Sequence, residues 1–159
     1  MGNTASISQN LATTADTMPG SYVVLAAITT TFLGEWHAGY VAKHRKVAKV
    51  PYPNAYVTHA EAQEDPDKFA FNCAQRAHAN YLEHQPQVVI PMLIAGLSYP
   101  SLSAAAGLAW CVARVIYTLG YVKNKKKQGR GRTAGSWYVA PELFLQGAAA
   151  WTGWQMLFA

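Results

Sequence analysis

Four apolar segments, separated by polar or basic stretches, constrain the fold of this chain more than any other feature of its sequence. The first and third, residues 21–41 and 102–121, are each long enough to cross a bilayer as a helix. The second, residues 88–97, continues a longer helical stretch, and the fourth covers residues 137–158. Only 13% of the residues are charged, against about 25% in soluble domains. The sequence therefore predicts an all-α, integral membrane four-helix bundle at residues 21–159, with helices at 21–46, 67–98, 102–124 and 136–158 after a flexible tail at residues 1–20.

The basic residues fall into two clusters, at residues 43–49 and 123–132, which follow the first and third apolar segments. With four spans, both clusters lie on the same side of the membrane, and an excess of Lys and Arg marks the cytoplasmic side. We therefore expect both basic loops in the cytosol and both chain termini in the lumen. Basic clusters beside apolar segments favour contact with phospholipid or a cytosolic anion. Because the sequence contains no nucleic-acid motif, we expect no nucleic-acid partner.

A stripe of polar residues is predicted along the second helix, immediately before its apolar half. Arg76, Asn80 and Glu83 are spaced by four and three residues, so a helix places them on one face. Ionisable groups close to hydrocarbon are costly and usually mark a ligand or ion site. The stripe is therefore a candidate binding site, while the plainer interpretation is a helix that starts in water.

A second stripe, Arg114, Tyr117 and Tyr121, is predicted on the third helix. Counted back from the cytosolic loops, at about 1.5 Å per residue, both stripes and Glu35 lie at a similar depth. Glu35 is expected to meet a cation on another helix, so that two carboxylates, Glu35 and Glu83, offset two arginines within one polar layer. A neutral layer below a cationic rim suits a small anion that also carries an amine. The rim is expected to contain Arg45, Lys46, Arg130 and Arg132.

Neither cysteine has the context of a disulfide or a metal ligand. Cys73 and Cys111 each fall in a predicted helix, so we expect free thiols that pack as small apolar residues. No spacing typical of a metal site occurs, and no metal is expected. His37 and Glu142 are interpreted as anchoring or pairing residues, and Arg114 as a brace between helices.

The segment Phe71-Asn72-Cys73-Ala74-Gln75-Arg76-Ala77-His78-Ala79-Asn80, with Leu82-Glu83, resembles the hallmark of the membrane-associated eicosanoid and glutathione metabolism family. The resemblance extends to the loop after the first helix and to the third helix, and it covers most of the chain from Tyr22 onward. It implies a homotrimer of four-helix protomers in the endoplasmic reticulum or nuclear envelope membrane, with the active site toward the cytosol.

The activity implied by this resemblance is that of a glutathione transferase, which conjugates glutathione, a co-substrate, to lipophilic electrophiles. Related activities are a glutathione-dependent lipid hydroperoxide peroxidase and a leukotriene C synthase. Lys46 occupies a position where relatives can have a proton-donating arginine. The residues implied to bind glutathione are Arg45, Arg76, His78, Asn80, Glu83, His84, Tyr117 and Tyr121.

The family's sulfur-activating arginine lies in the loop after the third helix, and here the sequence departs from the pattern. Counting from Tyr121 by the family spacing reaches Gln128, so a longer loop must present Arg130 or Arg132. We select Arg130 as the catalytic residue. A guanidinium beside a thiol favours the thiolate, which is the form that attacks electrophiles.

Two other functions stay open at this point. One is a non-catalytic lipid-binding scaffold that resembles the lipoxygenase-activating member of the same family, although that relative lacks an arginine at the place of Arg76. The other is an ion or proton carrier that uses Glu35, His37, Arg76 and Arg114 inside a bundle. Inverted repeats and broken helix pairs, which are typical of carriers, are not evident in the sequence.

Overall fold

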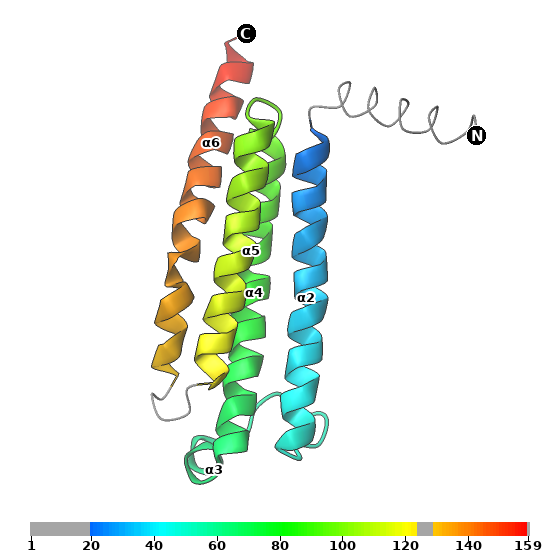
Figure 1. The fold of residues 1–159 in the computed structure, drawn as a ribbon, viewed down its shortest axis with the longest axis vertical. Helices are drawn as coiled ribbons and strands as arrows, with labels where there is room; N and C mark the ends of the chain where they lie inside the picture. The colour runs from blue at the N-terminus through cyan, green and yellow to red at the C-terminus, as the bar shows by residue number, and fades with distance from the viewer. Residues whose placement is uncertain (1–19, 124–128, 159) are drawn as a thin grey trace, which may run out of the picture.

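The computed structural model describes residues 20–123 and 129–158, and within these ranges the chain is helical without any strand (Figure 1). The prediction of an all-α chain is therefore confirmed for the described residues. The long helices run side by side along the longest axis, and the short helix α3 lies at one end of the bundle, which we call the α3 end (Figure 1). The expected tail lies outside the described residues except for Gly20. The helices are α2 (Ser21–Val47), α3 (His59–Glu64), α4 (Pro66–Ala95), α5 (Pro100–Lys123), the 3-10 helix η2 (Arg130–Tyr138) and α6 (Val139–Leu157).

The start of α4 follows from the residues at its N-terminus. The Asp65 side chain accepts hydrogen bonds from the backbone N–H groups of Asp67, at 2.8 Å, and Lys68, at 3.4 Å. Pro66 stands in the first turn, where a missing N–H costs nothing. The helix then continues through Pro86 and Pro91 to Ala95, so the polar stripe and the apolar half belong to one element.

The segment before α4 contains a helix, α3, that lies between the predicted helices at residues 21–46 and 67–98 and was not predicted. In α3, Glu61 N–H donates to the Thr58 hydroxyl at 3.3 Å, and the Glu61 carboxylate accepts from Thr58 N–H at 3.0 Å. This reciprocal capping box fixes the first turn of a helix of 6 residues. Asn72 on α4 holds the preceding loop, because its amide accepts from and donates to the Val57 backbone, each at 3.0 Å.

The last part of the chain also differs from expectation, because residues 130–138 form η2 and α6 begins only at Val139. Gly129, with φ of 75°, starts this segment in the left-handed region that glycine adopts without strain. A Cβ added to Gly135 would meet the α5 backbone at Ala113 and Tyr117. Glycine thus allows η2 to lie directly against α5, which positions the residues of η2 near the polar stripes.

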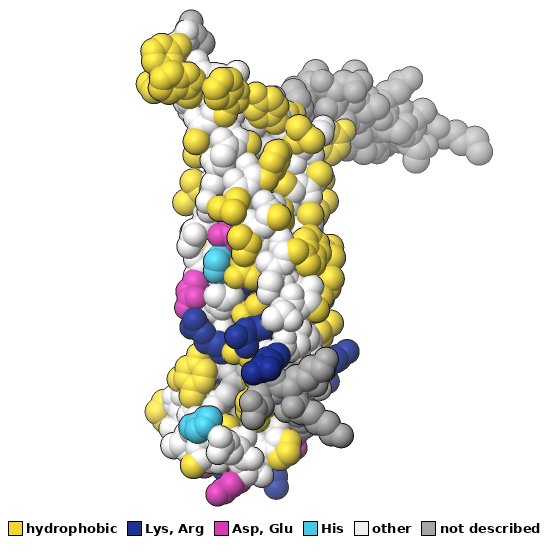
Figure 2. Space-filling view, turned by 90° about the vertical axis from the view of Figure 1, so that its left-hand side faces the viewer, with side chains coloured by type: hydrophobic (Ala, Val, Ile, Leu, Met, Phe, Trp, Pro, Cys, Tyr) yellow, Lys and Arg dark blue, Asp and Glu magenta, His cyan; other side chains and the backbone are white. Residues whose placement is uncertain are grey.

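One helix among the described residues, α5, is long and apolar enough to cross a membrane by length and composition. The hydropathy of the other long helices is lowered by polar residues: Glu35 and His37 in α2, the first half of α4, and Glu142 in α6. The surface of the bundle is nevertheless apolar, as Figure 2 shows for one face. Exposed large apolar residues include Phe32 on α2, Ile90 on α4, Val112 on α5, Leu143 on α6 and Trp154 on α6. Such an extended apolar surface marks contact with lipid or protein.

Candidate functional site

The predicted stripe on α4 forms a hydrogen-bonded group on one face of the helix. Arg76 Nη1 donates to Glu83 Oε1 at 3.0 Å, and Asn80 Nδ2 donates to Glu83 Oε2 at 3.2 Å. The Arg76 and Glu83 side chains are 51% and 50% exposed, so their remaining polar atoms are open to a ligand. The structure therefore brings together the cation, the amide and the anion that the spacing placed on one face.

A buried arginine connects this stripe to the interior of the bundle. Arg114 on α5 is fully buried, and its Nη1 donates to Asn80 Oδ1 at 3.0 Å. Its guanidinium carbon lies 4.4 Å from the centroid of the Tyr138 ring and 4.8 Å from that of Tyr117. Because Oδ1 of Asn80 is held by Arg114, its NH₂ group is directed to Glu83. The expectation that Arg114 braces helices is confirmed, and the brace also orients a predicted ligand residue.

Tyr121 lines a cavity together with Arg76 of the stripe, whereas Tyr117 does not line it. The cavity has a volume of about 250 Å³, and its lining includes Arg76, Tyr121, Tyr56 and Cys73. Tyr117 is 9% exposed and packs edge to face against Tyr121, with ring centroids 5.8 Å apart. We infer that Tyr121 is open to a ligand beside Arg76, while Tyr117 supports its ring.

The two arginines of η2 lie in different surroundings. Arg132 is half-buried, its guanidinium carbon lies 5.1 Å from the centroid of the Tyr121 ring, and its Nη1 donates to the Gly129 carbonyl at 3.2 Å. Arg130 is exposed and lines a different cavity of about 590 Å³, beside Lys123 and Leu119. Arg132 is thus the η2 arginine that contacts Tyr121. Gln128, which the family spacing reached, lies outside the described residues.

His84, a predicted ligand residue, forms an internal network with α6. Its Nδ1 lies 2.9 and 3.0 Å from the two carboxylate oxygens of Glu142, and its Nε2 lies 3.4 Å from the Tyr138 hydroxyl. A carboxylate only accepts, so Nδ1 must carry the hydrogen and donate. Trp110 Nε1 also donates to Glu142, at 3.3 Å. The expectation that Glu142 pairs is confirmed.

The composition of the polar layer differs from the expected one at two residues. Glu35 is exposed on α2 and forms no ion pair with any described residue, so the expected cation is not found within the described part of this chain. Glu142, buried against His84 and Trp110, is the second interior carboxylate in its place. Tyr138, the last residue of η2, is also buried, beside Arg114. The side of each helix that faces the core decides which polar groups belong to the layer.

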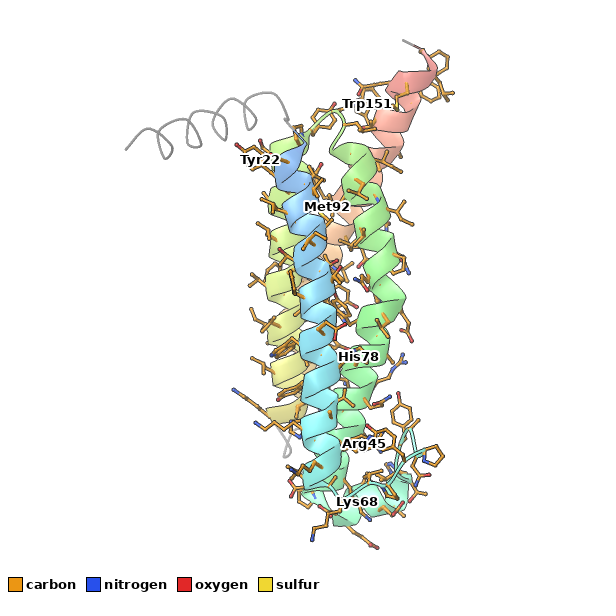
Figure 3. All side chains as sticks on the ribbon, turned by 90° about the vertical axis from the view of Figure 1, so that its right-hand side faces the viewer. Tyr22, Arg45, Lys68, His78, Met92 and Trp151 are labelled. Atoms are coloured by element: carbon orange, nitrogen blue, oxygen red, sulfur yellow. The ribbon has the colours of Figure 1, made fainter. Side chains whose placement is uncertain are left out.

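His78, Arg45 and Lys46 lie away from the stripe in the same chain. His78 is two residues from both Arg76 and Asn80, so it points to another side of α4, and its ring lies 5.9 Å from that of His37 on α2. Figure 3 shows Arg45 near the end of α2, nearer the α3 end than His78. Within one chain, these three predicted ligand residues are therefore not gathered with the stripe on α4.

Arg45 contacts the loop that follows α2. Its Nη1 donates to the Asn54 carbonyl at 2.7 Å, and its guanidinium carbon lies 4.3 Å from the Tyr52 ring and 4.7 Å from the Phe71 ring. Lys46 is exposed. Within the chain, Arg45 thus holds the loop, while the ammonium group of Lys46 is open to a ligand.

His37 is the most isolated polar group of the site region. It is 1% exposed, neither ring nitrogen has a hydrogen-bond partner among the described residues, and its ring stacks on that of Tyr81 at 4.5 Å. This arrangement is that of an anchoring residue between α2 and α4. Cys73 and Cys111 are free and buried, as expected. No group of three or more His, Cys, Asp or Glu side chains within residues 20–123 and 129–158 is placed to hold a metal ion.

The chain was compared with models of known protein families. Residues 23–151 match the model of the MAPEG family, the family whose hallmark the α4 segment resembles. The matched range contains every candidate site residue described above.

Proposed function

This chain belongs to the MAPEG family, since the match spans most of its length, and from this premise we propose that it is a membrane-bound glutathione transferase. The family is membrane-associated and includes glutathione transferases and related proteins. Within it, the α4 hallmark resembles that of microsomal glutathione S-transferase type three. The reaction we propose is attack of the glutathione thiolate on a lipophilic electrophile, with lipid hydroperoxide peroxidase and leukotriene C synthase activities as further reactions of the same site.

The observation that carries the proposal is the α4 stripe, which is held in place by Arg114 and opens beside Tyr121. Arg76 is suited to bind a carboxylate of glutathione, because its planar guanidinium can donate one hydrogen bond to each of the two carboxylate oxygens. Glu83 matches the amine of glutathione. Arg76 and Glu83 pair with each other at 3.0 Å, so the stripe has no net charge. When glutathione binds, Arg76 exchanges this contact for a carboxylate of the ligand, and Glu83 exchanges it for the ligand's amine.

The position of Arg132 supports it as the residue that stabilises the thiolate. A thiol has a pKa of about 8.5 and is mostly protonated at neutral pH. A guanidinium that lowers this value by one unit raises the ionised fraction about tenfold. Arg132 contacts Tyr121, whereas Arg130 lines a different cavity. The geometry thus favours Arg132 as this residue. Arg130, which was selected from the sequence, serves as the control in the test below.

Arg45, Lys46 and His78 are not gathered with the α4 stripe in one chain, and this supports a homotrimer that binds glutathione between neighbouring subunits. The Tyr121 cavity, at about 250 Å³, lies below the range of about 300–1,000 Å³ typical of ligand sites. In a closed ring, the surface with Arg45, Lys46 and His78 of one copy meets the surface with Arg76 of the next. In the proposed assembly Lys46 acts as the proton donor.

The distribution of charge supports the proposed orientation. Basic residues gather toward the α3 end of the bundle, and the face in Figure 2 is apolar toward the opposite end. We place the α3 end and the glutathione site at the cytosolic surface of the endoplasmic reticulum or nuclear envelope, with α2, α4, α5 and α6 as four spans. The electrophile or lipid hydroperoxide then enters sideways from the bilayer.

The test is turnover by the full chain purified in detergent. The protein is given glutathione with a chlorinated nitroaromatic compound and, separately, with a lipid hydroperoxide, while thiolate absorbance is recorded. Arg132→Ala should lose thiolate absorbance and turnover, and Arg130→Ala is the matched control that should keep both. No turnover with either compound, together with no glutathione binding, overturns the proposal. A protein that carries lipid without catalysis, the scaffold alternative, gives no heat on titration with glutathione.

A further inference from the structure

A groove between α2 and α5 lies outside the candidate glutathione site. It has a volume of about 880 Å³ and shares no lining residue with the Tyr121 cavity. Its walls are apolar, with Leu33 and Trp36 from α2 and Val115 and Leu119 from α5. The two helices run side by side in Figure 1. Such a volume lies within the range of small-molecule and lipid sites.

The groove is charged at one end only. Lys43 from α2 and Lys123 from α5 both line it at the α3 end, and both side chains are exposed. Neither lysine forms an ion pair with another residue in the described part of the chain, and no described carboxylate lines the groove. A pair of cations from two helices, above apolar walls, is complementary to an anionic group attached to a hydrocarbon chain.

The length of the groove matches one leaflet of a bilayer. From Lys43 to Leu33 the helix rises by about 15 Å, at about 1.5 Å per residue. Half the hydrocarbon core of a bilayer is also about 15 Å. Trp36 and Tyr40, whose rings stack at 5.2 Å and 16°, lie between these ends, where a flat apolar surface suits an acyl chain.

We propose that this groove binds an anionic phospholipid from one leaflet, with its phosphate at Lys43 and Lys123 and one acyl chain along Leu33, Trp36 and Leu119. The inference requires α2 and α5 to lie in a membrane, but it does not require glutathione binding. It therefore stands or fails separately from the transferase proposal.

Gly39 offers a way to fill the groove without disturbing the bundle. It lines the groove, and a Cβ added there meets nothing within 4 Å. A leucine at this position therefore projects into the space assigned to the lipid. Gly147 on α6 is equally open and lies outside the groove, so Gly147→Leu is the matched control.

The experiment is native mass spectrometry of the full chain in detergent, titrated with phosphatidylglycerol or with phosphatidylcholine of the same acyl chains. The wild type should prefer phosphatidylglycerol. The double variant Lys43→Gln with Lys123→Gln should reduce this preference by about fivefold per lysine. The double Lys→Arg variant should retain it.

Gly39→Leu should lower the occupancy of phosphatidylglycerol, while Gly147→Leu should not. Equal binding of the two lipids by the wild type, or a preference that survives loss of both lysines, overturns the proposal. A change of assembly mass in Gly39→Leu alone also overturns it, because the groove is then filled by a second copy of the chain.

Discussion

Replacing Arg114 with methionine separates the two roles of this buried guanidinium, which braces the bundle and orients Asn80. The variant removes one hydrogen bond to Asn80 Oδ1, of 3.0 Å, and the contacts with the Tyr138 and Tyr117 rings at 4.4 and 4.8 Å. Methionine is of similar length and fills the space without a charge. The question is whether fold stability, ligand affinity or both respond.

The expected change in stability is small because two effects oppose each other. A hydrogen bond to a charged group contributes about 1.5–3 kcal/mol, and each cation–π contact about 0.5–2 kcal/mol. Against this, a buried charge carries a desolvation penalty of several kcal/mol, and Nε and Nη2 of Arg114 lack partners among the described residues. We therefore expect the free energy of unfolding to change by no more than about 2 kcal/mol.

The affinity for glutathione is expected to fall, because no opposing effect compensates for the loss of order at Asn80. Once Arg114 no longer holds Asn80, the Asn80 side chain becomes ordered only when glutathione binds, at a cost of about 0.5–1.5 kcal/mol. The Kd for glutathione should then rise about two- to tenfold. Calorimetric titration in detergent measures the Kd, and thermal unfolding of the same sample measures stability. An unchanged Kd with a strongly lowered Tm would refute the orienting role.

A control for this prediction lies one turn further along α5. Thr118 is fully buried, and its hydroxyl has no hydrogen-bond partner among the described residues. Thr118→Val removes a polar group that has no partner, so the stability should not fall and the Kd for glutathione should not rise. A loss of affinity in this variant would indicate that any change within α5 disturbs the site.

Three further predictions concern the segments around the site. Hydrogen bonds from the Thr58 side chain and backbone lower the pKa of Glu61 from its usual 4.5 to about 2, so the capping contribution is complete above about pH 4.5 and is lost as the pH falls through about 2. The protection of the α3 amides against hydrogen exchange, measured relative to the intrinsic rate at each pH, should fall in that range, and in Thr58→Ala it should be low throughout. Asn72→Ala removes two hydrogen bonds to the loop backbone, each of about 1 kcal/mol, so limited proteolysis at residues 48–58 should speed up. Gly135→Ala places a Cβ on the α5 backbone and should lower the free energy of unfolding by about 1–3 kcal/mol and reduce turnover, whereas Gly147→Ala should change neither.

Each of these three predictions has a result that contradicts it. Protection of the α3 amides that does not change with pH would show that the capping box does not hold the helix. Unchanged cleavage in Asn72→Ala would show that the loop is fixed by other contacts, such as those of Arg45. Full stability in Gly135→Ala would mean that η2 can move away from α5 at little cost.

The stripe on α4 was predictable because it depends only on helical periodicity. Once residues 66–95 form one helix, Arg76, Asn80 and Glu83 must share a face, whatever the rest of the chain does. The start of α4 was also predictable, since Asp65 and Pro66 act through neighbouring backbone groups. Local geometry therefore determined this half of the candidate site.

The partners of the interior carboxylates depend on which helix face meets the core, and the sequence does not specify this. Glu35 and Glu142 both stand in apolar helices, yet Glu35 is exposed and Glu142 is buried against His84. The hydrophobic stripes of α2 and α6 are weak, because apolar residues occupy their exposed faces as well as their buried ones. Nothing in residue spacing could then assign the pairing.

Counting residues along the sequence could not decide between Arg130 and Arg132, and the reason is a different one. Residues 130–138 form a 3-10 helix against α5, and a 3-10 turn aligns residues three apart rather than four. Gly120 and Gly135 stand where the backbones of α5 and η2 approach each other closely, so they were the available clue to this packing. For α3, the clue was Thr58 followed three residues later by Glu61.

The central claim, that glutathione is bound between surfaces of two copies, can be measured by mixing defective subunits. Arg76→Ala removes the stripe from one surface, and Lys46→Ala removes the proton donor from the other, so each variant alone should have little transferase activity. In mixed rings formed by co-expression, about a quarter of the interfaces combine two intact surfaces, and about a quarter of wild-type turnover should return. If both single variants are inactive and mixed assemblies stay inactive as well, the site does not span two copies and the account is contradicted.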